Sequence, residues 1–360
     1  MTQSEGGVQC MMMRGGSSKG AYFRADDLPA EHSERDDLLR RIMGTPDARQ
    51  IDGIGGAHPL TSKVAIVSRS ARPDADVDYL FLQIGVEDAM VSDRQNCGNL
   101  LAGVAPFAIE RGLVSVDSAA STTTLRIHME NTGSVATATV HVYDGMPVYS
   151  GTTAISGVPG AAAPIRLEFA DIAGGTAGSL LPTGSARDRV SGVDCTLIDN
   201  GMPVVVLRAD AAGITGYESC ADLEANPSLL SFLEALHLEA GQLMGLGDVS
   251  AATVPKICLV APPRAGGALS TRTFIPRRCH DAIGVLGAVS VATAALLPGS
   301  PSSEVMAPIS GDSVILEHPT GLFEATIEIS RRGGQVVVER AGIVRTARKL
   351  MDAVVYPRSD

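Results

Sequence analysis

Residues 96–110 read NCGNLLAGVAPFAIE, and residues 278–297 read RCHDAIGVLGAVSVATAALL. Each stretch begins with a cysteine among small or polar residues and continues as an apolar run rich in Ala. A helix that is apolar on all sides has to be buried. The two stretches therefore predict two buried helices, one in each half, and hence two similar domains. We expect the boundary in the turn-rich segment 184–192, which divides the chain into 1–187 and 188–360.

Length and composition agree with this division. The chain has 360 residues, more than one hydrophobic core usually organises. Aromatic residues make up only 4% and there is no Trp, whereas there are 39 glycines. The core must then be built from Val, Leu, Ile, Ala and Met, with many tight turns. This favours a strand-rich α+β protein over a helical bundle.

Alternating or β-branched runs between turn residues predict strands, and apolar residues at helical spacing predict helices. Turns around 131–133 and 331–334 are expected to join two hairpins. The helix over 99–111 contains Pro106, which is expected to bend it or end it early. The predicted strands are 64–68, 79–86, 122–129, 134–143, 202–207, 256–261, 270–275, 314–317, 323–329 and 335–340. The predicted helices are 33–43, 99–111, 227–244 and 281–297.

The charge and the cysteines exclude several function classes. The formal net charge of −11 at pH 7 argues against a nucleic-acid surface, which requires a basic stripe. The apolar run at 283–297 is too short for a membrane span, and the one at 10–13 is too short for a signal peptide. The six cysteines are scattered without a C-x-x-C spacing. We therefore expect a cytoplasmic protein with reduced thiols, and no metal site.

Cys97 lies where the first buried helix is expected to begin. Unsatisfied N–H groups and the positive end of the helix dipole favour a thiolate at such a position. Asn96 and Asn99 flank it, and Gly98 lets a ligand approach N–H groups that can hold a carboxylate. A structural cysteine that happens to precede a helix is the alternative. The flanking residues favour a functional cysteine.

Lys63 follows a glycine-rich loop that begins at Gly53. The loop delivers Ser62 and Lys63 to the start of an apolar strand. Burying a lysine as a cation is costly, so an enclosed Lys63 would favour its neutral form and could act as a base. A lysine that reaches solvent from the strand end is the alternative. Lys256 opens a second apolar strand in a similar setting and is a candidate for carboxylate binding.

Two other polar segments are candidates for binding a carboxylate. The segment RGGSSKG, which starts at Arg14 and includes Ser17 and Ser18, lacks the spacing of a Walker A loop. Its hydroxyls and cations can still cradle a carboxylate, with a surface turn as the alternative. Arg278 and His280 precede the second apolar helix. A structural role stays open for both.

Four segments together resemble the PrpF family of isomerases, and the resemblance covers nearly the whole chain. They are MMRGGSSKGAYF at 12–23, IDGIGGAHPLTSKVAIVSRS at 51–70, NCGNLLAGVAPFAIE at 96–110 and LMGLGDVS at 243–250. The resemblance implies the diaminopimelate-epimerase fold: two similar α+β domains, each a curled, mostly antiparallel sheet around a central helix. The active site would lie in the interdomain cleft. It also implies a cofactor-free reaction with Lys63 and Cys97 as the acid/base pair.

The activity that the resemblance implies is a 1,3-allylic proton shift on an unsaturated di- or tricarboxylic acid. Keto–enol tautomerisation of 4-oxalomesaconate in gallate degradation is the first expectation, and isomerisation of aconitate or 2-methylaconitate is the alternative. The expected partner is a small polycarboxylate, with homo-oligomerisation left open and no cofactor, metal, nucleic acid or membrane. The expected substrate-binding residues are Arg14, Ser17, Ser18, Ser62, Asn96, Gly98, Asn99, Lys256, Arg278 and His280.

Three functions of other kinds stay open. A two-cysteine amino-acid epimerase would use Cys97 and Cys279. A binding protein for polycarboxylates would keep the fold without turnover. A Cys–His hydrolase would use Cys97 and His280, but no third group that would orient the histidine is evident.

Overall fold

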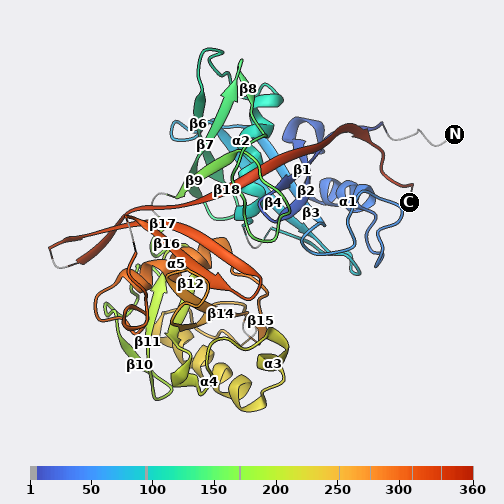
Figure 1. Cartoon of the computed structure of the whole chain (residues 1–360). Helices are drawn as coiled ribbons and strands as arrows, with labels where there is room; N and C mark the ends of the chain where they lie inside the picture. The colour runs from blue at the N-terminus through green and yellow to red at the C-terminus, as the bar shows by residue number, and fades with distance from the viewer. Residues whose placement is uncertain are drawn as a thin grey trace. The chain divides into compact units, whose positions relative to one another are not determined.

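The computed structural model describes residues 6–93, 96–169, 172–250, 252–275, 277–309, 311–333 and 335–359. The chain forms two compact units (Figure 1), which consist of Met1–Glu168 with Val344–Asp360 and of Phe169–Ile343. The division expected at 187/188 differs from this one in two ways. The first unit ends earlier, and the C-terminal segment returns to it. The return is made by β18 (Gln335–Val355), which pairs with β17 at its start and with β1 at its end.

Unit 1 is a sheet that closes on itself. Its strands are joined in the order β18–β1–β2–β3–β4–β6–β7–β9, and β9 pairs again with β18. The pairs β2–β3 and β4–β6 are parallel, because α1 (His32–Met43) and α2 (Gly98–Glu110) connect them. The strands are β1 (Val8–Gly15), β2 (Ser18–Arg24), β3 (Lys63–Arg69), β4 (Val77–Ile84), β6 (Thr122–Met129), β7 (Ser134–Tyr143) and β9 (Pro164–Phe169). Two short strands, β5 (Val91–Ser92) and β8 (Met146–Pro147), pair with β4 and β7.

Unit 2 repeats this topology. Its strands are joined in the order β10–β11–β12–β13–β14–β16–β17, followed by the start of β18. The pairs β12–β13 and β14–β16 are parallel, as at the matching points of unit 1. The strands are β10 (Asp188–Val190), β11 (Val193–Asp199), β12 (Pro203–Arg208), β13 (Lys256–Ala261), β14 (Leu269–Ile275), β15 (Arg278–Cys279), β16 (Ser313–His318) and β17 (Gly321–Arg332). The helices are α3 (Cys220–Glu224), α4 (Pro227–Leu243) and α5 (Val285–Leu296). The repeat expected from the sequence is therefore present, with β3 matching β13 and α2 matching α5.

The helix α2 is the centre of unit 1. Every residue from Leu100 to Ile109 is buried, and α2 contacts strands on all sides of the closed sheet. Pro106 lies inside the helix and does not end it, so of the two expected effects, a bend or an early end, the early end was wrong. The helix ends at Glu110, one residue before the predicted end, and Gly112 just after it has φ +64°, a conformation that favours glycine after a helix.

The helix α5 begins four residues later than its sequence predicted, at Val285 and not at Asp281. The reason is that Cys279 pairs with Phe274 in β15, and the N–H of His280 donates to the carbonyl oxygen of Thr273. The N-cap of α5 is therefore Gly284. The counterpart of Cys97 in unit 2 is this glycine, and the matching of Cys97 with Cys279 was wrong.

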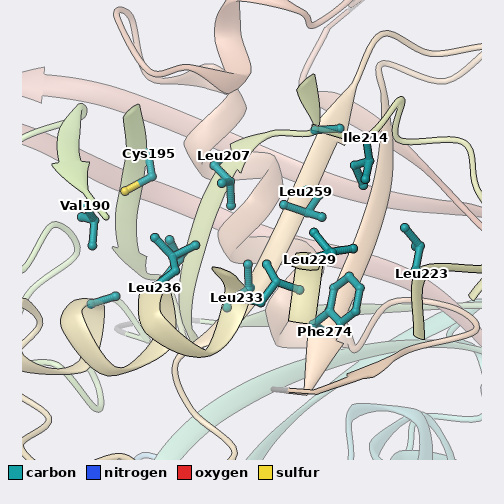
Figure 2. Close-up of a cluster of buried hydrophobic side chains, with 14 of the residues drawn as sticks. Val190, Cys195, Leu207, Ile214, Leu223, Leu229, Leu233, Leu236, Leu259 and Phe274 are labelled. Atoms are coloured by element: carbon teal, nitrogen blue, oxygen red, sulfur yellow. The ribbon is translucent and has the colours of Figure 1, made fainter. Parts of the chain in front are cut away.

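A hydrophobic core of unit 2 lies between α4 and the strands of that unit (Figure 2). Leu229, Leu233 and Leu236 of α4 are nearly unexposed and pack against Leu207 and Leu259 of the strands. Burying each leucine contributes about 1.5–3 kcal/mol relative to leaving it exposed. The helix predicted over 227–244 is thereby confirmed. None of the helices in the described residues is long and apolar enough to span a bilayer.

Candidate active site

Lys63 opens β3, and of the two alternatives that the sequence left open, an enclosed or a solvent-reaching side chain, the structure shows the enclosed one, with 7% of the residue exposed. Its Nζ donates a 2.7 Å hydrogen bond to Oε1 of Gln83, the residue directly opposite on β4. The same nitrogen lies 4.9 Å from the centre of the Phe81 ring. A ring face and an amide oxygen both stabilise an ammonium group. The setting therefore holds Lys63 in one position and lowers the cost of burying its charge.

Gln83 is a residue of the site that the sequence reasoning missed. Its Nε2 donates to the carbonyl oxygens of Pro59 and Ser62, at 3.1 and 2.9 Å. Because the amide nitrogen faces this loop, the amide oxygen has to face Lys63. The available signal was a single glutamine in the otherwise apolar end of β4, Tyr79 to Ile84.

Ser62 belongs to the loop that precedes Lys63. It is fully buried, and its hydroxyl accepts a 2.8 Å hydrogen bond from Nε2 of Gln50. The Oε1 of Gln50 accepts the N–H of Ala57 at 2.8 Å, which ties the glycine-rich loop together. The structure thus gives Ser62 a part in shaping this loop.

Cys97 is the N-cap of α2, as its sequence predicted. Its backbone is extended, with φ −125°, and no side chain caps the helix. Its carbonyl oxygen accepts the first helical hydrogen bond, from Leu101 at 3.0 Å, and a 3.3 Å bond from the hydroxyl of Tyr79. Its own N–H donates to the side chain of Asn96 at 2.8 Å. An uncapped helix start of this kind is suited to an anion.

The hairpin between β1 and β2 touches the start of α2. Gly16 has φ +52°, and a Cβ there would lie 2.1 Å from Oδ1 of Asn99, so only glycine fits. Asn99 also holds Ser17, whose hydroxyl accepts a 3.2 Å hydrogen bond from Nδ2. The hydroxyl of Ser18 is buried and, among the described residues, has no hydrogen-bond partner. Such a group is costly unless a ligand or water satisfies it.

Arg14 fixes the same hairpin from the other side. Its Nη1 donates to the carbonyl oxygens of Gly16 and Thr346, at 2.8 and 2.9 Å. Burial lowers the pKa of the guanidinium, and Arg348 lowers it further. One nitrogen of Arg14 is therefore occupied by the main chain, and the segment RGGSSKG forms a tight turn between β1 and β2.

One face of β4 connects Lys63 to Cys97. Tyr79, Phe81 and Gln83 alternate along the strand and so point to the same side. Lys63 contacts the last two of them, and the main chain of Cys97 contacts the first. Burial, followed by the charge of Cys97, raises the pKa of Tyr79, so its hydroxyl stays protonated. The two predicted proton carriers thus lie along the same buried face.

Unit 2 has a matching lysine. Lys256 opens β13 as Lys63 opens β3, and a Cβ on Gly284 would lie 3.7 Å from its Nζ. The ammonium is therefore next to the uncapped start of α5. Burial lowers its pKa. Burial and Lys256 also lower the pKa of His280, whose Nδ1 accepts the N–H of Ala282 at 2.9 Å. The neutral His280 consequently presents Nε2–H as a donor.

Arg278 and Cys279 are placed differently from these two residues. The side chain of Arg278 is 87% exposed and lies 3.9 Å from a carboxylate oxygen of Glu224. Cys279 is buried, and burial raises the pKa of its thiol. Neither the position of Cys279 in a strand nor its raised pKa suits an acid/base thiolate.

Comparison with known proteins identifies the family. The family described as PrpF protein matches residues 6–358. The chain belongs to the PrpF family. It is 57% identical to the (4E)-oxalomesaconate Delta-isomerase of a Novosphingobium strain, with 96% of each chain covered. It is 56% identical to the 4-oxalomesaconate tautomerase of Pseudomonas putida, with 97% of this chain and 95% of the relative covered.

Solved structures show the fold of this PrpF-family chain. A methylitaconate-delta-isomerase superimposes with a TM-score of 0.87 at 34% identity, covering 97% of this chain and 95% of that one. A probable proline racemase from Agrobacterium radiobacter superimposes with a TM-score of 0.56 at 14% identity, over 96% and 92% of the two chains. The fold is therefore the epimerase-like one that the resemblance implied. Within the described residues, no cluster of three or more His, Cys, Asp and Glu side chains could hold a metal ion.

Proposed function

We propose that this protein is a cofactor-independent isomerase of 4-oxalomesaconate, with Lys63 and Cys97 as the groups that carry protons. The observation that supports it most is the enclosed Lys63 on the same face of β4 as the cysteine that begins α2. Two relatives named for 4-oxalomesaconate, at 57% and 56% identity, support the substrate.

The reaction begins at the methylene carbon between the oxalo carbonyl and the double bond. One of the two groups removes a proton from this carbon, which leaves a dienolate whose charge is shared by the carbonyl oxygen and the far alkene carbon. The other group returns a proton. General acid/base transfer of this kind contributes about 10²–10⁴-fold to the rate. The uncapped start of α2 and nearby cations stabilise the negative charge of the dienolate.

The polar groups around the pair bind the substrate carboxylates in this proposal. In unit 1 these are Ser17, Ser18, Asn99 and the N–H groups at the start of α2, with the buried hydroxyl of Ser18 as the clearest unsatisfied donor. Unit 2 supplies Lys256 and the Nε2–H of His280, so the active site is proposed to draw on both units. The remaining candidates from the sequence are Arg14, Ser62, Asn96, Gly98 and Arg278, of which Arg278 is the most exposed. The free cysteines fit a cytoplasmic location.

Two outcomes of the same dienolate are open. Protonation of the oxygen gives the enol and makes the protein a tautomerase. Protonation of the far alkene carbon moves the double bond and makes it an allylic isomerase. Both outcomes have a named relative at nearly the same identity, and keto–enol tautomerisation is our first choice.

Proton NMR of 4-oxalomesaconate incubated with the protein distinguishes the two. A tautomerase interconverts the methylene signal and the enol vinyl signal, whereas an allylic isomerase creates a new methylene next to a different carboxylate. Parallel reactions with trans-aconitate, 2-methylaconitate and methylitaconate test the substrate. Faster turnover of any of these three than of 4-oxalomesaconate would contradict the proposal.

A further inference from the structure

Two cysteines of unit 2 lie side by side outside the proton-transfer pair. The Sγ atoms of Cys220, at the start of α3, and Cys279, in β15, are 3.0 Å apart. A disulfide has its sulfurs about 2.05 Å apart, so bond formation requires a shift of about 1 Å. Both residues are free thiols in this structure, and the sequence alone gave no sign that they would meet.

The surroundings hold the two thiols in this arrangement. The N–H of Cys279 donates a 3.0 Å hydrogen bond to Oε1 of Glu224, which is the last residue of α3. The Sγ of Cys220 contacts the carbonyl oxygen of His280 at 3.7 Å. The short helix is therefore attached to β15 at both of its ends. A bond between the sulfurs would add to contacts that already exist and requires only a small shift of β15 and α3 towards each other.

The two thiols differ in access. Cys220 is partly exposed, whereas Cys279 is buried. An oxidant can therefore reach the first, and the second is in place to react with the product. Burial and the neighbouring Cys220 raise the pKa of Cys279, so the second step should become faster as the pH rises.

We propose that Cys220 and Cys279 form a reversible disulfide when the protein is exposed to hydrogen peroxide. The thiolate of Cys220 attacks one peroxide oxygen, which breaks the O–O bond and gives a sulfenic acid and water. The thiolate of Cys279 then attacks the sulfenic sulfur, forms the S–S bond and releases a second water. In sum, two thiols are oxidised to a disulfide while one peroxide is reduced to two waters.

The disulfide has a consequence for the substrate, which rests on the proposed function. Cys279 is covalently next to His280, and the Cys220 sulfur touches the His280 carbonyl oxygen. Drawing Cys279 towards α3 shifts His280 relative to Lys256, the neighbour whose charge already affects its pKa. Oxidation should therefore weaken substrate binding and raise KM several-fold, while kcat changes little because Lys63 and Cys97 lie in the other unit.

The test is a peptide map of the whole protein after mild peroxide treatment and alkylation of free thiols. We expect a linked peptide pair containing Cys220 and Cys279, which disappears after dithiothreitol. The matched control is Cys195→Ala, which removes a buried thiol of the same unit and should leave the linked pair intact. Cys220→Ala should abolish it. Oxidation of Cys220 to a sulfinic acid without the linked pair would overturn the proposal.

The kinetic part separates this disulfide from damage to Cys97. Oxidation of Cys97 would lower kcat in wild type and in Cys220→Ala alike. The disulfide should raise KM in wild type alone, and dithiothreitol should reverse the change. A linked pair with unchanged KM would overturn the coupling to the substrate. A reduced protein that does not turn over 4-oxalomesaconate would contradict the proposed function and leave the peptide map as an independent result.

Discussion

Lys63 combines burial with a fixed position. Its ammonium group is held by one amide oxygen and one aromatic face, contributed by Gln83 and Phe81. Because Nε2 of Gln83 is bound to the loop before Lys63, the lysine and its partner are positioned by the same short segment. In the proposed mechanism, Gln83 is therefore a positioning residue for Lys63.

Replacing Gln83 by Met should lower kcat/KM by about 10–100-fold, because a displacement of about 1 Å at a reacting group costs up to about 10²-fold. Gln83→Glu retains an acceptor for Nζ but adds a negative charge, which favours the charged lysine. Its pH–rate profile should therefore shift to higher pH. A purely structural role for Gln83 predicts a lower melting temperature in both variants, with no shift of the profile.

Lys256 should make kcat/KM fall on the alkaline side of its pH profile. Burial lowers its pKa, so it loses its proton at a lower pH than an exposed lysine does. If its ammonium binds a carboxylate, kcat/KM falls as the pH rises through this lowered pKa. Lys256→Arg keeps its charge over the whole accessible range and should move the fall to higher pH. An unchanged alkaline limb in this variant would show that Lys256 does not bind the substrate as a cation.

Lys256 should also lower the free energy of unfolding. A lowered pKa in the folded state means that the unfolded chain binds the proton more strongly, so the ammonium destabilises the fold below the folded pKa. Lys256→Met should therefore raise the melting temperature at pH 7 by about 2–4 °C, which corresponds to about 1 kcal/mol. The gain should shrink as the pH rises and vanish above the unfolded pKa of about 10.4. Scanning calorimetry at pH 7 and pH 10.5 measures both values.

At the level of elements, the two central helices differ in how tightly their glycines are enclosed. A Cβ on Gly103 of α2 would lie 2.4 Å from the hydroxyl oxygen of Tyr22, which itself donates a 2.5 Å hydrogen bond to the carbonyl oxygen of Leu100. At Gly287 of α5, nothing lies within 4 Å of the added atom. The two positions form a matched pair for testing the packing.

Gly103→Ala should destabilise the protein by about 1–3 kcal/mol, because the extra methyl group forces Tyr22 away from the helix. Gly287→Ala should be neutral or stabilising by up to about 1 kcal/mol, because alanine favours a helix more than glycine does. Urea denaturation of both variants measures the difference. Equal effects of the two substitutions would contradict the close packing of Tyr22 against α2.

The sequence predicted those helices and strands whose pattern of apolar and polar residues lies within one short segment. The helix expected over 99–111 is observed as Gly98–Glu110, and the strand that begins with Lys63 starts at that residue. The start of α5 was misplaced because β15 is a pair of residues whose conformation depends on tertiary partners, Phe274 and Glu224. No bounds were predicted for β1 and β2, but the surface turn that was the alternative for the segment RGGSSKG is observed between them.

The residues of the candidate site likewise divide into those with a local sequence pattern and those that depend on tertiary contacts. The position of Cys97 at a helix start could be derived from a local sequence pattern. For Lys63 the sequence predicted the start of an apolar strand, but it left open whether the side chain is enclosed or reaches solvent. Gln83 and the Cys220–Cys279 contact could not, because each joins residues that are distant in sequence. The proposed binding of carboxylates by Lys256 and His280 depends on the substrate as well as on the chain, so local sequence patterns do not determine it.

At the scale of the whole molecule, two units of the same topology have different residues at equivalent positions. Lysines open both β3 and β13, whereas the start of the central helix is Cys97 in unit 1 and Gly284 in unit 2. A thiol is therefore present at only one of the two helix starts. This difference between equivalent positions fits the proposed division of roles, with proton transfer in unit 1 and carboxylate binding in unit 2.

The most direct test of the central claim is proton exchange in deuterium oxide, followed by proton NMR of 4-oxalomesaconate. Wild type should replace the methylene protons by deuterium, and Lys63→Met and Cys97→Ser should each slow the full reaction by about 10²-fold or more. The variant that lacks the base should lose exchange itself. Retention of the methylene protons during wild-type incubation, or near-normal turnover by either variant, would contradict the account.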